Sequence, residues 1–196
     1  MSKEHPPHHV PVLLEATLRE LAPREGESYL DLTAGYAGHA SAILSRTKND
    51  SGAVLFARDD YAIEHLQPLA DRGVILLHPD FVSAARQLCE EGASFDLLLI
   101  DLGVSSPQLD RAERGFSFRL DGPLDMRMDN RSTRTAADIV NSYNEKELAE
   151  LIVRYGEETR GRARRIAQAI VEARPFHQTA ELAAVIEHTL GRGGLK

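Results

Sequence analysis

The sequence predicts an α/β fold, with a parallel sheet in the first half of the chain and helices in the second. Four short apolar runs, at 28–32, 53–57, 74–77 and 96–101, are continuous rather than alternating. Such runs are typical of strands that are buried on both faces of a parallel sheet. Segments with helical periodicity separate them, which gives βαβ units with right-handed crossovers. The final third of the sequence has helical segments and no further run of this kind.

The helices of the first half are expected before and between these strands. One over 11–21 begins at a proline suited to a first turn and places its leucines on one face. The first strand runs into a glycine-containing turn at 33–38, and a helix follows. Asp59 or Asp60 is expected to cap the helix after the second strand. The next helix carries Cys89 among apolar neighbours, so we expect its thiol to be buried and unreactive.

The second half opens with an aperiodic stretch at 103–134 that is rich in Gly, Pro, Asp and Arg. Two capping boxes then mark helix starts, one pairing Thr135 with Asp138 and the other pairing Asn144 with Glu147.

Two further helices are expected near the C-terminal end. One covers 162–173 and stops before Pro175, and the other runs from a Thr179 cap to Gly191.

The change of pattern divides the protein into two expected domains, 1–110 and 111–196, which differ in charge. The first has 8 basic and 17 acidic side chains, a balance of −9, and the second has 15 and 13, a balance of +2. A net charge of −7 argues against avid nonspecific nucleic-acid binding. The second domain can still present a basic face, because nine arginines form two clusters: Arg111, Arg114, Arg119 and Arg127, and Arg154, Arg160, Arg162, Arg164 and Arg165.

Composition excludes several classes of protein. A single cysteine excludes a disulfide framework and a multi-cysteine metal site. No apolar run approaches the ~20 residues of a membrane helix, and the N-terminal segment has no apolar signal core. We therefore expect a cytoplasmic protein without a membrane partner. His5, His8 and His9 are expected to belong to a flexible terminus, so no metal site is predicted.

Four segments follow the predicted strands and converge where open α/β sheets bind ligands. The first, 31–39, contains glycines that allow close backbone approach and leads into a helix N-terminus. The second, 57–60, contains acidic residues about 20 positions after the glycine turn, where an acidic residue typically binds ribose hydroxyls. The third, 78–81, ends in Phe81, which could pack against adenine, and the fourth is 101–108.

These residues also have simpler interpretations. Gly35 and Gly38 could serve only the turn, Asp59 and Asp60 could be only helix caps, and His39 could be an ordinary helix residue. The glycines do not form G-x-G-x-x-G, so spacing alone leaves a nicotinamide dinucleotide and S-adenosylmethionine equally open.

One stretch is far more specific: residues 101–129, DLGVSSPQLDRAERGFSFRLDGPLDMRMD. It closely resembles the MraW family, also called ribosomal small-subunit methyltransferase H. Further agreement lies in five short motifs: HVPVLL at 9–14, YLDLT at 29–33, TAAD at 135–138, YGEE at 155–158 and RIAQAI at 165–170. Members of this family use S-adenosylmethionine to methylate N4 of a cytidine in 16S ribosomal RNA near the decoding centre.

The resemblance implies a class I, Rossmann-like methyltransferase fold with a helical domain inserted after the fourth strand. The family continues beyond the point matching Lys196 with a His-Pro-Ala-Thr-Arg segment, a long helix and the last strands of the sheet. The expected sheet is therefore incomplete, and the sequence is expected to be truncated at its C-terminal end. The expected partner is 16S ribosomal RNA in the small ribosomal subunit. DNA is not expected, because Asp101 is followed by Leu-Gly and not by Pro-Pro-aromatic.

The residues and the resemblance together nominate a set of site residues. Those expected to bind S-adenosylmethionine are Gly35, Ala37, Gly38, His39, Asp59, Phe81, Asp101 and Gln108. Asp101 is also the expected catalytic residue, and those expected to orient the base or a phosphate are Ser105, Ser106, Asp125 and Arg127.

Two positions depart from the family pattern. The family has an acidic residue where this chain has Ala57, and the first glycine of its Gly-Gly-His motif is Ala37 here. The alternative function is therefore a noncatalytic or degenerate member of the family that acts as a binding module.

Overall fold

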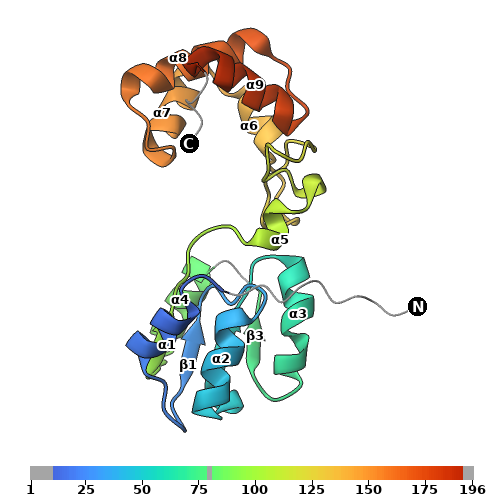
Figure 1. The fold of residues 1–196 in the computed structure, drawn as a ribbon. Helices are drawn as coiled ribbons and strands as arrows, with labels where there is room; N and C mark the ends of the chain where they lie inside the picture. Colours follow the sequence, from blue (N-terminus) through green and yellow to red (C-terminus); the bar gives the residue numbers. More distant parts are fainter. Residues whose placement is uncertain (1–10, 79–80, 192–196) are drawn as a thin grey trace, which may run out of the picture. The chain divides into compact units, whose positions relative to one another are not determined.

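The structure, a computed structural model, describes residues 11–78 and 81–191. It divides into two compact units, Met1–Gly103 and Val104–Lys196, which are described separately (Figure 1). Within the described residues, no helix is long and apolar enough to cross a membrane. The same residues contain no group of three or more side chains placed to bind a metal. His5, His8 and His9 lie outside the described residues.

The first unit is built on a parallel sheet, as the continuous apolar runs predict. Its strands are β1 (Tyr29–Asp31), β2 (Ala53–Phe56), β3 (Ile75–Leu77) and β4 (Leu97–Leu99). Their order is β3-β2-β1-β4, and every neighbouring pair is parallel. In the register, Leu30 lies opposite Val54 on one side and Leu98 on the other.

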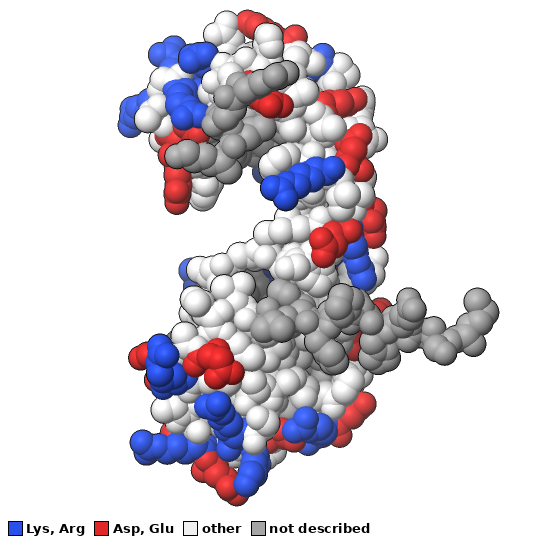
Figure 2. Space-filling model, viewed as in Figure 1, with Lys and Arg blue, Asp and Glu red and all other residues white. Residues whose placement is uncertain are grey.

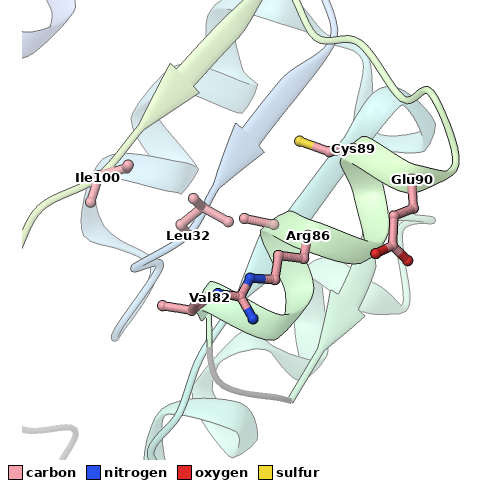
Figure 3. Close-up of a pocket in the computed structure, with 7 residues that line it drawn as sticks. Leu32, Val82, Arg86, Cys89, Glu90 and Ile100 are labelled. Carbon is pink, nitrogen blue, oxygen red and sulfur yellow. The ribbon is translucent and has the colours of Figure 1, made fainter.

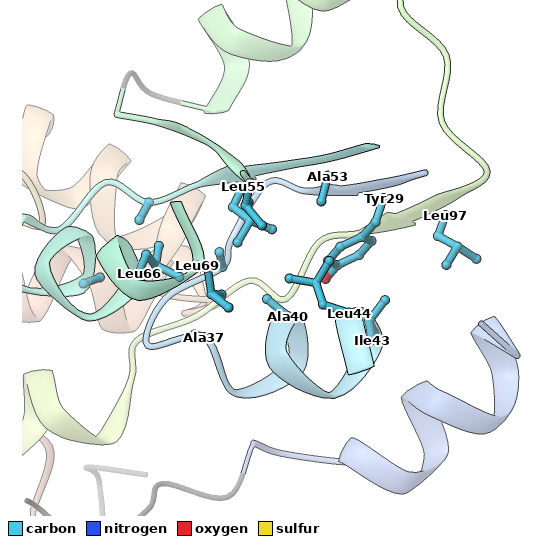
Figure 4. Close-up of a cluster of buried hydrophobic side chains, with 14 of the residues drawn as sticks. Tyr29, Ala37, Ala40, Ile43, Leu44, Ala53, Leu55, Leu66, Leu69 and Leu97 are labelled. Atoms are coloured by element: carbon cyan, nitrogen blue, oxygen red, sulfur yellow. The ribbon is translucent and has the colours of Figure 1, made fainter. Parts of the chain in front are cut away.

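Helices cover both faces of this sheet because successive strand residues point to opposite faces. On one face Tyr29, Leu55 and Leu97 join a buried cluster with residues of α1 (Leu14–Leu21), α2 (Gly38–Thr47) and α3 (Asp60–Ala70) (Figure 4). On the other face Leu30, Val54 and Phe56 pack against α4 (Phe81–Glu90). A short 3₁₀ turn, Asp50–Gly52, precedes β2.

Two details of the first unit differ from expectation. Helix α1 begins at Leu14 rather than Pro11, because Leu13 has a left-handed backbone with φ of 57°. Cys89 is exposed, so the expectation of a buried thiol is wrong. Helix α4 turns a narrow stripe toward the sheet, including Ala84 and Leu88. Ala85 packs against the sheet as well, and Cys89, four residues later, lies about 40° beyond it round the helix, past the edge of that stripe.

The second unit is helical and contains α6 (Ala136–Ser142), α7 (Glu145–Tyr155), α8 (Arg160–Ala173) and α9 (Thr179–Leu190). A short helix α5 (Ser106–Leu109) and a 3₁₀ turn (Ala112–Arg114) lie in the segment predicted to be aperiodic. The helices enclose a core that includes Val140, Leu148, Ile166, Ile170 and Phe176.

The predicted capping boxes of the second unit are confirmed. Thr135 and Asn144 each accept the backbone N–H of the residue three positions on, at 3.1 and 3.0 Å. Helix α8 begins two residues earlier than expected, with Thr159 as its cap. Helix α9 is capped at Gln178, so Thr179 is its first residue and not its cap.

Candidate functional site

The strand order places a switch point between β1 and β4. From β1 the backbone moves outward to β2 and β3, and then returns to the opposite side of β1 to form β4. Open α/β sheets bind ligands outside the carboxyl ends of the strands at such a point. The residues that follow β1 and β4 therefore form the candidate site of the first unit.

Hydrogen bonds hold the loops after these strands together. The Leu32 N–H donates to the Leu99 carbonyl at 3.1 Å and continues the β1–β4 ladder. One step further, the backbone N–H of Asp101 donates to Oγ1 of Thr33 at 2.6 Å. On the other side, the Ala34 N–H donates to the Phe56 carbonyl at 2.9 Å. The loop after β1 is thus attached to both neighbouring strands.

This loop turns through two left-handed residues before α2. Gly35 has φ of +51°, and an added Cβ would meet nothing closer than 3.6 Å, so the turn itself requires a flexible residue there. Ala37, the N-cap of α2, has φ of 69°. A left-handed backbone costs a residue with a Cβ roughly 1–2 kcal/mol. The family's glycine would avoid this strain at Ala37.

Gly38 has an ordinary helical backbone, and its lack of a side chain has a different cause. A Cβ there would come closer than 3.0 Å to Cγ of Pro11. The segment at Pro11 and Val12 therefore packs directly against the first turn of α2. Gly38 therefore does more than serve the turn, because the absence of a Cβ there makes room for Pro11.

His39 lies between that segment and Asp101. Its Nε2 is 3.1 Å from the Val12 carbonyl oxygen, and its Nδ1 is 3.7 Å from Oδ2 of Asp101. A carbonyl oxygen can only accept, so Nε2 carries the proton in this contact. The ring is nearly buried, whereas the Asp101 side chain is 55% exposed. Asp101 therefore presents a carboxylate that a ligand can reach.

Beneath the loop lies a buried carboxyl group that was not nominated as a site residue from the sequence. Asp31 is 1% exposed and accepts the Tyr29 hydroxyl at 2.6 Å and the Thr33 N–H at 2.9 Å. Burial raises the pKa of Asp31, and its hydrogen bonds oppose that rise. Burial and the Asp31 charge likewise raise the pKa of the Tyr29 phenol. The sequence signal that could have identified Asp31 is the presence of an acidic residue inside the apolar run SYLDL.

The end of β2 offers less to a ligand than its sequence suggests. Ala57 is buried, and its N–H donates to the Leu77 carbonyl at 3.3 Å. Asp59 caps α3, with Oδ1 accepting the Tyr61 N–H at 3.1 Å, and its side chain is buried. The capping prediction for Asp59 is therefore confirmed.

The third predicted segment is described only in part. Residues 79–80 lie outside the described residues, and Phe81 begins α4 with its side chain also outside them. Its expected packing against adenine stays a prediction.

An open groove of about 520 Å³ lies beside this helix (Figure 3). Its lining includes Val82, Arg86, Cys89 and Glu90 of α4, Leu32, which follows β1, and Ile100, which follows β4. The remaining lining residue is Ala85.

In the second unit, Gln108 is buried, and its Oε1 accepts the Ser105 N–H at 2.9 Å across the start of α5. Ser106 is the first residue of that helix. The Gln108 carbonyl oxygen thus orders this segment of the second unit, and its expected contact with the cofactor stays a prediction.

Asp125 and Arg127 form a two-pronged ion pair with each other. Nε and Nη2 of Arg127 donate to the Asp125 carboxylate at 2.8 and 2.7 Å, and Nη1 donates to the Ser132 carbonyl at 2.8 Å. The hydrogen bond from Arg127 lowers the pKa of Asp125. Arg114, which the sequence placed only in a charge cluster, is buried and donates to the Arg127 carbonyl at 3.0 Å. These groups brace the loop in which they lie.

Comparison with known proteins gives one consistent result. The model of the MraW methylase family matches residues 6–192. The protein is 48% identical to the ribosomal RNA small subunit methyltransferase H of Acidobacterium capsulatum, over 91% of this chain and 62% of that protein. It is 46% identical to the protein of that name from Citrifermentans bemidjiense (93% and 60%) and 38% identical to that of Mycoplasma mycoides (96% and 62%). The chain spans about three fifths of the length of these relatives. It belongs to the MraW methylase family.

Proposed function

We propose that the protein acts in S-adenosylmethionine-dependent methylation of small-subunit (16S) ribosomal RNA, at N4 of a cytidine near the decoding centre. The observation that carries this proposal is the exposed carboxylate of Asp101, anchored to the β1 loop at the switch point of the sheet. The names of the relatives, which specify methylation of small-subunit ribosomal RNA, support the substrate class. The cytidine N4 position comes from the resemblance of residues 101–129.

The loop after β1 suits S-adenosylmethionine at one end of the site. Gly35 has no side chain to hinder a close approach to the backbone, and α2 begins at Gly38 with its free N–H groups and positive dipole end. Gly35, Ala37, Gly38, His39 and Asp101 are proposed to hold the cofactor there. When bound, it supplies a methyl group on a positively charged sulfur.

The part of the proposed site that would bind the ribose of S-adenosylmethionine fits the cofactor less well. Ala57 offers no carboxylate, and Asp59 is buried as a helix cap. The missing charge-assisted hydrogen bond is worth about 1.5–3 kcal/mol. Phe81, Gln108 and Asp59 are proposed to complete the cofactor site.

Asp101 is suited to the chemistry of a cytosine amino group. That nitrogen is a poor nucleophile because its lone pair is delocalised into the ring. A carboxylate that accepts a hydrogen bond from the amino group fixes its direction and stabilises the positive charge that develops on it. Catalysis of this kind is mainly positioning, and it requires the rigid attachment that Thr33 gives to Asp101.

The RNA is proposed to contact residues 111–196, together with Ser105 and Ser106. Lys and Arg side chains gather over α7 and α8 (Figure 2). Arg154 of α7 and Arg160 and Arg164 of α8 are exposed. In a duplex, the N4 amino group of a cytidine is engaged in a Watson–Crick pair. The target cytidine must therefore be unpaired or flipped out. Asp125 and Arg127 are proposed to shape the loop that receives the base, since they already bind each other.

A second candidate function is a noncatalytic binding module of the same family. Two observations favour it: the buried methyl group of Ala57 where the family has a carboxylate, and the strained backbone of Ala37. Such a module would bind RNA without transferring a methyl group.

Calorimetry with S-adenosylmethionine separates the two candidates. Saturable binding, weakened in Asp101→Asn but unchanged in the exposed control Asp71→Asn, supports the methyltransferase. No binding at millimolar cofactor would overturn it. Transfer of a tritiated methyl group to isolated 30S subunits, followed by nucleoside analysis, tests the substrate. Label in N4-methylcytidine is expected, and label only in a duplex DNA control would overturn the assignment.

A further inference from the structure

Thr33 occupies the point where the β1–β4 ladder ends. The last regular register pair joins Asp31 to Leu99. The next bond uses a backbone carbonyl, that of Leu99, but the bond after it uses a side chain: Oγ1 of Thr33 accepts the Asp101 N–H at 2.6 Å. These two residues are 68 positions apart in sequence. The backbone of Asp101 thus leaves the sheet against a hydroxyl group.

The Thr33 hydroxyl is itself oriented from below. Its oxygen accepts from Asp101, so its proton is available to Oδ1 of Asp31, 3.4 Å away. The same Asp31 oxygen accepts the Thr33 N–H, and the other accepts the hydroxyl of the fully buried Tyr29. The bonds form a continuous network from Tyr29 to the Asp101 backbone. The Tyr29–Asp31 end of this network is buried, and buried polar groups stiffen the structure when each of them is satisfied. Thr33, which is half-buried, carries the network from there to Asp101 at the surface.

His39 does not provide an equivalent restraint. Its Nδ1 lies 3.7 Å from the Asp101 carboxylate, which is too long for a hydrogen bond. The carboxylate itself is therefore directed mainly by the backbone from which it projects.

We infer that Thr33 is a positioning residue for Asp101: its hydroxyl, oriented by the Asp31 carboxylate, fixes the backbone from which the Asp101 side chain meets the cofactor and the amino group. The inference rests on the proposed function. Threonine suits the task because its branched Cβ restricts χ1. Serine keeps the oxygen with less restriction, and valine keeps the shape without the oxygen.

The test uses the full-length protein with three variants: Thr33→Val, Thr33→Ser and Thr47→Val. Thr47 is the matched control, because it is also a threonine in this unit and its buried hydroxyl has no hydrogen-bond partner among the described residues. In Thr33→Val, hydrogen exchange at the Asp101 amide is expected to rise about tenfold, the change from losing one ordinary hydrogen bond. Thr33→Ser and Thr47→Val are expected to keep slow exchange.

Affinity for S-adenosylmethionine, measured by calorimetry, supplies the functional readout. Thr33→Val is expected to weaken binding about fivefold or more, with rescue in Thr33→Ser and no change in Thr47→Val. Unchanged exchange and affinity in Thr33→Val, or equal losses in Thr47→Val, would overturn the inference. If the unmodified protein binds no cofactor, the proposed function fails. Exchange at Asp101 then decides by itself whether Thr33 fixes this backbone.

Discussion

Replacing Gly38 with alanine tests whether the N-terminal segment packs on the candidate cofactor loop. The added Cβ would lie closer than 3.0 Å to Cγ of Pro11 and 3.1 Å from its Cδ, but 3.5 Å from its Cβ. Only the last of these distances is an ordinary contact. Pro11→Ala removes Cγ and Cδ and keeps Cβ, so it should relieve the clash completely.

The magnitude follows from two opposing effects. Overpacking against Pro11 costs about 1–3 kcal/mol, whereas alanine in place of glycine inside a helix gains up to about 1 kcal/mol. Gly38→Ala alone should therefore lower the free energy of unfolding by up to about 3 kcal/mol. In the Pro11→Ala background only the gain in helix propensity remains. The expected coupling energy between the two substitutions is about 1–3 kcal/mol.

Urea unfolding of the unmodified protein, the two single variants and the double variant gives this coupling energy directly. Equal destabilisation by Gly38→Ala in both backgrounds would refute the packing of Pro11 on α2. In that case Gly38 would be required for another reason, such as close approach of a ligand. Cofactor affinity of the double variant would then be the deciding measurement.

Three further predictions concern other positions. Ala57→Asp should tighten S-adenosylmethionine binding about tenfold or more in calorimetry, and unchanged affinity would contradict a ribose site there. Asp125 has a lowered pKa because of its hydrogen bond from Arg127. Its stabilising contribution is therefore complete above the unfolded value of about 4 and lost as pH falls through the lower folded value. Asp125→Asn should accordingly destabilise the protein to urea at pH 6, and this effect should shrink as the pH falls below about 4. An effect that does not change with pH would contradict this. Gly115→Ala, where a Cβ would lie 2.7 Å from the Asp125 backbone nitrogen, should destabilise by about 2 kcal/mol more than Gly26→Ala, which meets nothing within 4 Å. Equal losses in urea unfolding would refute that difference.

The fold could be predicted from the sequence because its main determinants are local. Continuous apolar runs mark strands buried on both faces, and all four were found, although each strand is shorter than its run. Capping boxes at Thr135 and Asn144 marked helix starts to the residue. Cys89 was misplaced because apolar neighbours in sequence do not show where the buried stripe of a helix ends.

For the site, the sequence predicted only which residues follow the strands, and not how those residues contact one another. Asp101 and the β1 loop were nominated because both follow strands, but their bond through Thr33 depends on β1 and β4 being neighbours. Strand order is a property of the whole sheet and is not contained in local spacing. For the same reason Asp31 was not nominated as a site residue. Its partners are the hydroxyl of Tyr29, two residues earlier on the strand, and the Thr33 N–H in a loop that the sheet positions.

Of the two departures from the family pattern, Ala57 bears more directly on function than Ala37. The left-handed turn at Ala37 is maintained by the sheet, because the Ala37 N–H donates to the Ala34 carbonyl and the Ala34 N–H donates to the Phe56 carbonyl, both at 2.9 Å. The alanine therefore costs stability while the loop keeps its shape. At Ala57 the shape is also kept, but the group that would bind ribose is missing, and the nearby Asp59 is committed to capping α3. Ala57→Asp is therefore the substitution that best separates the proposed methyltransferase from the proposed binding module.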